Sequence, residues 1–255
     1  AAFSFNFIDT KMVITSRKNE SVKFFSSLKD AKGRKEADGY LVEGEKQVYE
    51  AVAFKAGVKK IMGLPSLVER YLGSGIEIIG ISEEIASFVS DSVTPQGVFA
   101  FVAFPEKRKI EGDAVLLDGV SDPGNVGTII RTAAAVGIKN VCVLNGVDPF
   151  CPKCVRSSMG GLNSVYACRV SFEEALSLFS GRKVYVADMD GKNVFGKRKT
   201  EDFCLVIGNE AHGVSDEIKA RCDEVLSLPM RGNMESLNAG VSCSVILYEL
   251  LQDLI

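Results

Sequence analysis

Three loops of the sequence combine glycine with polar side chains that could act on a ligand. The first loop, residues 118–127 (DGVSDPGNVG), contains Asn125, and Arg131 follows six residues later. An amide and a guanidinium that can hold two oxygens at once would suit a polar ligand. The loop has neither the Gly-x-Gly-x-x-Gly spacing of dinucleotide-binding folds nor the Gly-Lys-Ser/Thr of a P-loop. A turn whose glycines only shape the start of a helix is the alternative, but it leaves Asn125 and Arg131 unexplained.

The second loop, residues 208–213 (GNEAHG), carries Glu210 and His212, the one histidine of the chain. A carboxylate and an imidazole this close together could serve as an acid–base pair. A single histidine is more often incidental than catalytic, so a chemical role for His212 stays open.

Residues 228–250 (LPMRGNMESLNAGVSCSVILYEL) form the third loop and a predicted helix, with Ser236 and Asn238 where the helix should start. Ser236, Gly240 and Ser244 recur every four residues, so one face of the helix is almost bare of side chains. Such a face allows either close packing of another backbone or the approach of a ligand. Helix starts expose unpaired N–H groups, and short polar side chains there can orient a polar substrate.

The elements that must position these loops alternate between strands and helices. Strand patterns cover 114–117, 140–144, 183–187 and 203–207, and helical patterns cover 126–136 and 171–179. This alternation predicts an α/β fold with a parallel sheet, helices on both faces, and ligands at the carboxyl ends of the strands. The glycine loops fall at those ends, so we expect one pocket for a polar organic ligand.

A smaller α/β domain is predicted before this sheet. Helical patterns cover about 20–31, 43–56, 65–72 and 82–90, and strand patterns cover 39–42, 59–62, 76–79 and 97–103. A charged stretch between two apolar ones, residues 105–112, has the character of an interdomain linker. We therefore expect one domain at 11–104 and a second at 113–255.

The composition is that of an ordinary globular protein, with 46% hydrophobic and 25% charged residues in a chain of 255. The longest uncharged run, Ser92–Pro105, is too short to span a membrane. The sequence begins AAFSFNFIDT, without a basic segment before its apolar residues, so we expect no secretory signal and a cytoplasmic protein.

Seven cysteines, an odd number scattered through the chain, are best explained as reduced thiols. Cys151 and Cys154 have the spacing of half a zinc site or of a redox pair. With no second Cys-x-x-Cys and a single histidine, we expect no metal site.

The net charge of −3 argues against a generally sticky nucleic-acid binder, but the charge is unevenly distributed. Residues 11–35 contain eight basic and two acidic side chains, a local charge of +6. A solvated surface is the usual meaning of such a run, yet one that is nearly of one sign also suits a phosphate backbone. The residues predicted to contact RNA are Arg17, Lys18, Arg34 and Lys35.

At this point the motifs resemble those of a known family. NVGTIIRTAA from Asn125, IGNEAHG from Ile207 and LPMRGNMESLNAGVSCSVILYE from Leu228 are similar, in order and spacing, to the three motifs of the SpoU (TrmH) family of RNA ribose 2′-O-methyltransferases. The resemblance covers about residues 112–252, including RSSMG at 156–160. Residues 14–46 resemble the substrate-binding domain of the ribosomal-RNA members.

The resemblance implies a sheet whose C-terminal segment is threaded as a deep trefoil knot, with S-adenosylmethionine bound in the knot. It also implies a homodimer with the site near the subunit interface. The positions that match the family's cofactor-binding backbone are Gly208, Leu228 and Leu237. The positions that match its catalytic residues are Asn125, Arg131, Glu210, Ser236 and Asn238. Ala239-Gly240 stands where many members have Val-Ser, which puts a role for that second serine in doubt.

The function implied is methyl transfer from S-adenosylmethionine to a ribose 2′-hydroxyl, in ribosomal RNA because of the separate N-terminal domain. Transfer RNA as the substrate and a ribosome-associated RNA-binding module without activity are the alternatives. An arginine stays protonated to about pH 12, so we interpret Arg131 as a clamp on an RNA phosphate, with Asn125 and Ser236 orienting the ribose. A splayed-out nucleotide of single-stranded or loop RNA is the expected target.

Overall fold

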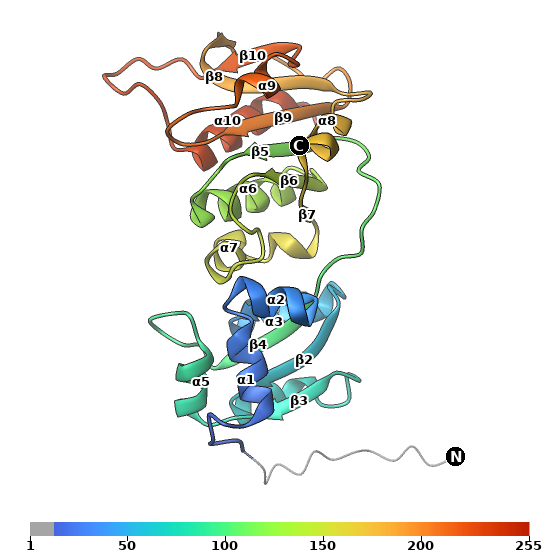
Figure 1. Ribbon diagram of the computed structural model, residues 1–255, viewed down its shortest axis with the longest axis vertical. Helices are drawn as coiled ribbons and strands as arrows, with labels where there is room; N and C mark the ends of the chain where they lie inside the picture. Colours follow the sequence, from blue (N-terminus) through green and yellow to red (C-terminus); the bar gives the residue numbers. More distant parts are fainter. Residues whose placement is uncertain (1–12, 255) are drawn as a thin grey trace. The chain divides into compact units, whose positions relative to one another are not determined.

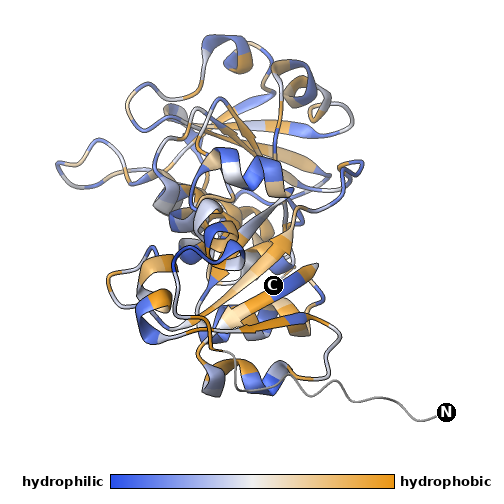
Figure 2. Cartoon of the chain, turned by 60° about the horizontal axis from the view of Figure 1, so that its bottom comes forward, coloured by the Kyte–Doolittle hydropathy of each residue, from blue (hydrophilic) through white to orange (hydrophobic). Residues whose placement is uncertain are grey.

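The computed structural model describes residues 13–254, so Lys11, the first residue of the predicted basic segment, lies outside it. The chain divides into two compact units. The first consists of Ala1–Glu106 with Phe150–Pro152, and the second of Lys107–Pro149 with Lys153–Ile255. Strands of both sheets are mostly apolar, while loops and outer helix faces carry hydrophilic residues (Figure 2).

The first unit is built on a four-stranded sheet. Its strands, in spatial order, are β1 (Gly39–Glu43), β4 (Val98–Ala103), β2 (Val58–Gly63) and β3 (Glu77–Gly80). The helices are α1 (Glu20–Ser27), α2 (Ala31–Ala37), α3 (Glu45–Ala53), α4 (Pro65–Val68), the 3-10 turn η1 (Glu69–Tyr71) and α5 (Glu83–Val89). Phe25 of α1 and Ile85 of α5 are fully buried against sheet residues such as Phe99, which gives this unit its own core.

The second unit contains a six-stranded parallel sheet with the spatial order β10-β8-β9-β5-β6-β7 (Figure 1). The strands are β5 (Ala114–Asp118), β6 (Asn140–Leu144), β7 (Tyr166–Arg169), β8 (Lys183–Asn193), β9 (Phe203–Gly208) and β10 (Glu224–Ser227). The helices are α6 (Pro123–Ala135), α7 (Pro152–Ser158), the 3-10 turn η2 (Gly161–Asn163), α8 (Phe172–Ser177), α9 (Asp216–Lys219) and α10 (Ala239–Leu251). The predicted parallel sheet is confirmed.

Helices cover both faces of this sheet, as the alternation of strands and helices indicated. Ala175 of α8 and Ile218 of α9 pack on one face, in a cluster with Leu116 of β5 and Val206 of β9. Side chains alternate between faces along a strand, so the neighbouring strand residues point to the other face. There α6 and α10 pack against each other, and α10 also contacts β9.

The bare face of α10 packs against α6. A Cβ built on Gly240 would lie 3.2 Å from the Cβ and Cγ2 atoms of Thr128, and the hydroxyl groups of Ser244 and Thr132 are 2.7 Å apart. Of the two uses predicted for the small residues, the structure therefore shows close helix packing. The helix begins at Ala239, so Ser236 does not lie on it as the spacing suggested.

Several short elements escaped the sequence patterns. The helix predicted at 20–31 ends at Ser27, and a second helix that was not predicted, α2, begins at Ala31. The corner between them is so tight that a Cβ on Gly33 would overlap the carbonyl group of Ser27. Helices α7 and α9 and the edge strands β7 and β10 were not predicted. Each has only four to seven residues, which is too short for a period of 3.6 or 2 to show in the sequence.

Candidate active site

The predicted loops meet where β5 and β9 end. These two strands are neighbours in the middle of the sheet, and the chain leads from β5 toward β6 on one side and from β8 to β9 on the other. Such a reversal of strand order opens a crevice at the carboxyl ends, where open α/β sheets bind their ligands. The side-chain amide of Asn209, just after β9, donates to the carbonyl of Gly119, just after β5, over 2.8 Å.

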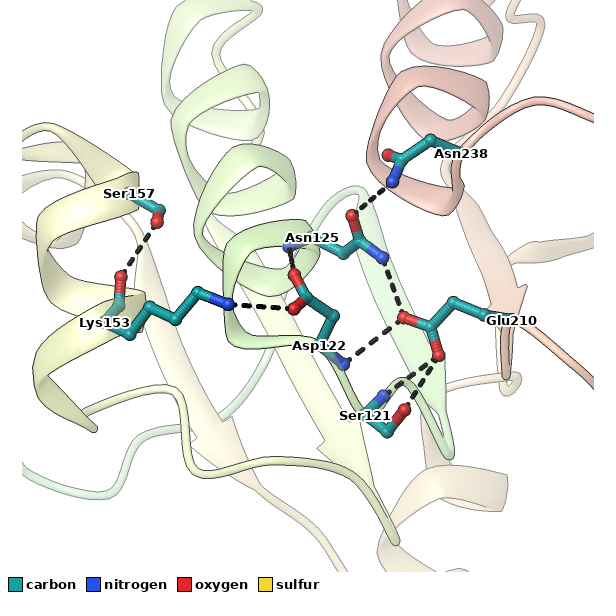
Figure 3. A network of polar contacts seen from close by, with 7 residues as sticks. All are labelled: Ser121, Asp122, Asn125, Lys153, Ser157, Glu210 and Asn238. Atoms are coloured by element: carbon teal, nitrogen blue, oxygen red, sulfur yellow. Dashed lines mark hydrogen bonds and ion pairs between the residues drawn. The ribbon is translucent and has the colours of Figure 1, made fainter.

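The Glu210 carboxylate joins the second loop to the first (Figure 3). One oxygen accepts from the backbone N–H and the hydroxyl of Ser121, at 3.2 and 3.0 Å. The other accepts from the backbone N–H of Asp122 at 3.3 Å and from Nδ2 of Asn125 at 2.7 Å. Four donors from a single turn therefore converge on one carboxylate.

These hydrogen bonds keep Glu210 ionised. Partial burial raises its pKa, but the bonds from Asn125 and Ser121 outweigh that effect, so the pKa of the carboxyl lies below its ordinary value of 4.5. The network's contribution to stability is therefore complete above that value and is lost as the pH falls through the lowered pKa. A general base works best with a pKa near the operating pH. The pKa of Glu210 lies below its ordinary value, so the carboxylate is a weak base and is better suited to hold the loops in place.

Asn125 connects Glu210 to the third loop. It lies in the first turn of α6, where its backbone N–H donates to the Asp122 side chain over 2.9 Å and so completes the N-cap. Its amide is buried, with Nδ2 bound to Glu210 and Oδ1 accepting from Nδ2 of Asn238 over 2.7 Å. Each end of the amide has one partner within the protein, so Asn125 links the loops, and its role in orienting the ribose stays a prediction.

Asn238 is the N-cap of α10. Its Oδ1 accepts from the N–H groups of Gly240 and Val241, at 2.9 and 3.2 Å, while its Nδ2 reaches Asn125. One amide thus fixes the start of α10 to the start of α6. Through Glu210, Asn125 and Asn238 the structure brings all three predicted loops together.

Three participants were missed by the sequence reasoning, namely Ser121, Asp122 and Lys153. They belong to the same network, and Nζ of Lys153 lies 3.0 Å from the Asp122 carboxylate (Figure 3). The hydrogen bond from Lys153 is the main reason why the pKa of Asp122 lies below its ordinary value. Lys153 lies between Cys151 and Cys154, and the sequence analysis considered this segment only for its two cysteines. Helix α7 directs the lysine side chain toward Asp122.

Other predicted residues lie outside the network. Arg131 is exposed on α6, and its guanidinium has no hydrogen bond or ion pair within residues 13–254. Ser236 and Leu237 are exposed in the loop that precedes α10, and His212 is exposed with only its backbone N–H bound, to Asn209. These groups are available to a ligand without breaking a side-chain hydrogen bond, whereas Asn125 and Asn238 each hold a partner within the protein.

The loop before α10 fits a polar organic cofactor. Backbone N–H and C=O groups of residues 228–236 form no hydrogen bond within the described part of the chain, and residues 231–238 are exposed. The loop has no helix or strand and reaches out from the sheet (Figure 1). Beside it, Gly208 ends β9 so close to Gly213 that a Cβ would overlap that backbone. Unpaired backbone groups next to a narrow glycine turn are what the resemblance assigns to cofactor binding.

The predicted RNA contacts differ in their surroundings. Lys18 and Lys35 are exposed, and Arg17 pairs with Glu84 at 2.9 Å. Arg34 is only 3% exposed, and its guanidinium donates to the carbonyls of Leu28 and Lys29 at 3.0 and 2.8 Å. The prediction for Arg34 is therefore wrong, because this side chain stabilises the corner between α1 and α2.

Within residues 13–254, no group of three or more His, Cys, Asp or Glu side chains is placed to hold a metal ion. The same part of the chain contains no helix with the length and apolar character that a membrane span requires.

Comparison with known proteins agrees with this architecture. Residues 113–248 match the SpoU rRNA Methylase family, and residues 19–100 match an MRM3-like substrate binding domain. The 23S rRNA (guanosine(2553)-2′-O)-methyltransferase RlmP of Bacillus subtilis is 35% identical over 248 residues, which are 93% of this chain and 98% of that protein. The chain belongs to the SpoU rRNA methylase family.

Solved structures resemble nearly the whole chain. The AdoMet-bound rRNA methyltransferase from Sinorhizobium meliloti has a TM-score of 0.84 at 26% identity, covering 96% of this chain and 98% of that one. The SpoU methyltransferase AviRb from Streptomyces viridochromogenes, in complex with AdoMet, has a TM-score of 0.82 at 28% identity, covering 92% and 98%. The family predicted from the three motifs is thus confirmed.

Substitutions at Asn238 separate its cap from its link to Asn125. Asn238→Ala removes both and should lower the free energy of unfolding by about 0.5–2 kcal/mol, the usual cost of a lost N-cap. Asn238→Asp keeps an oxygen for the cap but offers no donor to Asn125, so the stability that it loses reflects the link to Asn125 and not the cap. Hydrogen–deuterium exchange of residues 118–125 and 208–213 should rise in both variants. Unchanged exchange in Asn238→Asp would show that the link does not order the loops.

Proposed function

We propose that this chain transfers a methyl group from S-adenosylmethionine to a ribose 2′-hydroxyl of ribosomal RNA. The observation that carries the proposal is the network in which Glu210, Asn125 and Asn238 join three loops at one edge of the sheet. Family membership and two AdoMet-bound neighbours support the cofactor. The match over nearly the full length of a 23S rRNA 2′-O-methyltransferase favours ribosomal RNA over transfer RNA.

The cofactor would be held by backbone groups around Gly208, Leu228 and Leu237. The support is the row of unpaired N–H and C=O groups at residues 228–236. When bound, S-adenosylmethionine supplies the electrophilic methyl group. The protein must then align the ribose hydroxyl with that methyl, and alignment can contribute about 7–11 kcal/mol to lowering the barrier.

Arg131 acts on the RNA in this proposal. Its five N–H donors have no partner in the described chain, and its charge persists at every physiological pH. It is therefore free to hold a phosphate next to the target ribose and so lower the pKa of the hydroxyl. Ser236, exposed in the cofactor loop, orients the ribose together with Asn125, and the bonds that join Asn125, Glu210 and Asn238 hold the three loops at fixed positions.

The proposal also assigns a separate role to each domain. Residues 11–104 would bind the RNA substrate, 105–112 would serve as the linker, and 113–255 would carry the knotted methyltransferase domain. Exposed Lys18 and Lys35, together with Arg17, would contact phosphates. The knot and a cytoplasmic location stay predictions. A ribosome-associated module without activity is disfavoured because the network around Glu210 is complete.

We also propose a homodimer formed through α10. Val241 and Tyr248, on one side of this helix, are 45% and 49% exposed, and the partly buried Val245 lies between them. Apolar side chains at intervals of four and three residues form a continuous stripe on a helix. A second copy of the stripe would cover it and place a partner subunit beside Asn238.

The function is tested by incubating the protein with radiolabelled S-adenosylmethionine and RNA transcribed in vitro, which carries no modification. We expect label in large-subunit ribosomal RNA and none in transfer RNA. Replacing the labelled nucleotide by its 2′-deoxy form should abolish incorporation, because the accepting hydroxyl is gone. Label in transfer RNA alone would establish the alternative substrate, and binding of RNA without label would establish the inactive module.

Arg131 variants distinguish a clamp from a base. Arg131→Ala should leave cofactor affinity unchanged and lower the single-turnover rate by about 10²–10³, the usual cost of removing one electrostatic donor. Arg131→Lys should recover part of the rate, because a positive charge remains. The control is Lys192→Ala, which removes an exposed cation of the same unit. Activity of Arg131→Lys that appears only as the lysine deprotonates near pH 10 would identify a base instead.

The dimer is tested by sedimentation velocity. The wild type should sediment as a dimer of the 27.5-kDa chain, and Tyr248→Arg should dissociate it, because two charges would face each other in an apolar interface. Met189→Arg is the matched control, since Met189 is 63% exposed elsewhere in the same unit. A wild-type protein that is monomeric at micromolar concentration, or a monomeric Met189→Arg variant, would contradict the α10 interface.

A further inference from the structure

A cavity of about 670 Å³ lies in the second unit, away from the loops around Glu210. It is lined by residues 107–112, which precede β5, by Tyr166 and Arg169 of β7, by the end of α8, and by Asp202, which precedes β9. Residues 107–112 and Asp202 precede β5 and β9, so they lie at the amino edge of the sheet, about 17 Å from the carboxyl ends of these strands. Arg169 ends β7, an edge strand that β6 separates from β5. The cavity is therefore separate from the proposed methyl-transfer site.

The cavity is positively charged although the chain as a whole carries −3. Its lining contains five basic side chains, Lys107, Arg108, Lys109, Arg169 and Arg182, and three acidic ones, Glu111, Glu174 and Asp202. Its volume lies within the roughly 300–1,000 Å³ of small-molecule sites. An anionic ligand larger than a simple ion suits both properties.

Two of these arginines build a fixed wall. Arg182 donates to the carbonyls of Gly112, Ile110 and Leu178 at 2.6, 2.7 and 2.9 Å. Arg108 lies over the Tyr166 ring, 4.9 Å from its centroid, and donates to Oδ1 of Asn140 at 3.3 Å. The segment 107–112 is thereby fastened to the sheet, with an aromatic ring and a guanidinium stacked at its side.

The remaining cations are free to meet a ligand. Arg169 is exposed and has no hydrogen bond or ion pair within residues 13–254. Lys107 approaches Glu174 only to 3.9 Å and Lys109 approaches Glu111 to 3.6 Å, and all four side chains are largely exposed. Such pairs contribute about 0–1 kcal/mol, so a phosphate can replace the carboxylates at little cost.

We propose that this cavity binds a phosphorylated nucleotide, with the phosphate on Arg169 and Lys107 and the base against Arg108 and Tyr166. All four bases can stack on aromatic rings and on guanidinium planes. This inference rests on the proposed function, because we take the occupant to be a nucleotide of the ribosomal RNA other than the one that is methylated. A free mononucleotide offers the same chemistry, and the experiment separates the two.

The first measurement is the salt dependence of RNA binding by Arg169→Gln and Lys107→Gln. Each lost phosphate contact should lower the slope of log affinity against log salt by about 0.7–0.9. Lys192→Gln, which removes one exposed cation of the same unit outside the cavity, should keep the wild-type slope. Equal slopes for Arg169→Gln, Lys107→Gln and Lys192→Gln would rule out an RNA strand as the occupant of the cavity.

The second measurement is alkylation of Cys168 by N-ethylmaleimide, read by mass spectrometry. Cys168 is half-buried and lines the cavity, whereas the half-buried Cys222 does not and serves as internal reference. Ligand at ten times its Kd should slow the reaction of Cys168 about tenfold, as the free fraction falls with 1 + [L]/Kd. Arg169→Gln should lose this protection.

Separate arms with ribosomal RNA and with 5′-AMP identify the occupant. Protection by RNA supports an RNA strand, and protection by 5′-AMP alone supports a free nucleotide. Protection by neither overturns the cavity as a nucleotide site. Methylation is measured on the same protein, so a wild type that methylates ribosomal RNA without protecting Cys168 refutes the cavity and not the proposed function.

Discussion

The arrangement of the three loops depends on one carboxylate, that of Glu210, which accepts hydrogen bonds from the neighbouring loop. Glu210 accepts four hydrogen bonds from Ser121, Asp122 and Asn125, and Asn125 passes the connection on to Asn238 and the start of α10. Bonds to an ionised acceptor are about twice as strong as neutral ones. Without this side chain, the turn after β5 would lose the acceptor of four hydrogen bonds, and Asn125, which holds the start of α10, would lose one of its two side-chain partners.

The strand order makes this arrangement possible. Because β5 and β9 are neighbours from which the chain departs in opposite directions, their following loops meet without a helix between them. α10 can then approach α6 only because Gly240 and Ser244 present almost no side chain to Thr128 and Thr132. The small residues therefore serve the site indirectly, by allowing the helix that Asn238 caps to lie next to Asn125.

Long helices and strands, and loops with unusual residue types, could be predicted from the sequence, whereas contacts between side chains far apart in the sequence could not. The strand at 140–144 was predicted to the residue, because a buried parallel strand is a continuous apolar run. Arg34 is a basic residue next to the basic Lys35, yet the three-residue break between α1 and α2 turns its guanidinium inward. Lys153 was missed because its partner Asp122 is thirty-one positions away. Contacts of that separation depend on the tertiary fold and leave no local pattern.

The polar groups of the site fall into two sets, and the division follows from hydrogen bonding. The side chains of Asn125, Glu210 and Asn238 are bonded to one another or to the loops within the protein, so they define the geometry of a ligand site. Arg131, Ser236 and the backbone of residues 228–236 are exposed, and neither the guanidinium nor that backbone has a partner in the described chain. A site that must hold both a cofactor and a strand of RNA needs both sets. The occupied groups keep the three loops at fixed spacing, and the free groups can then bind without first breaking internal hydrogen bonds.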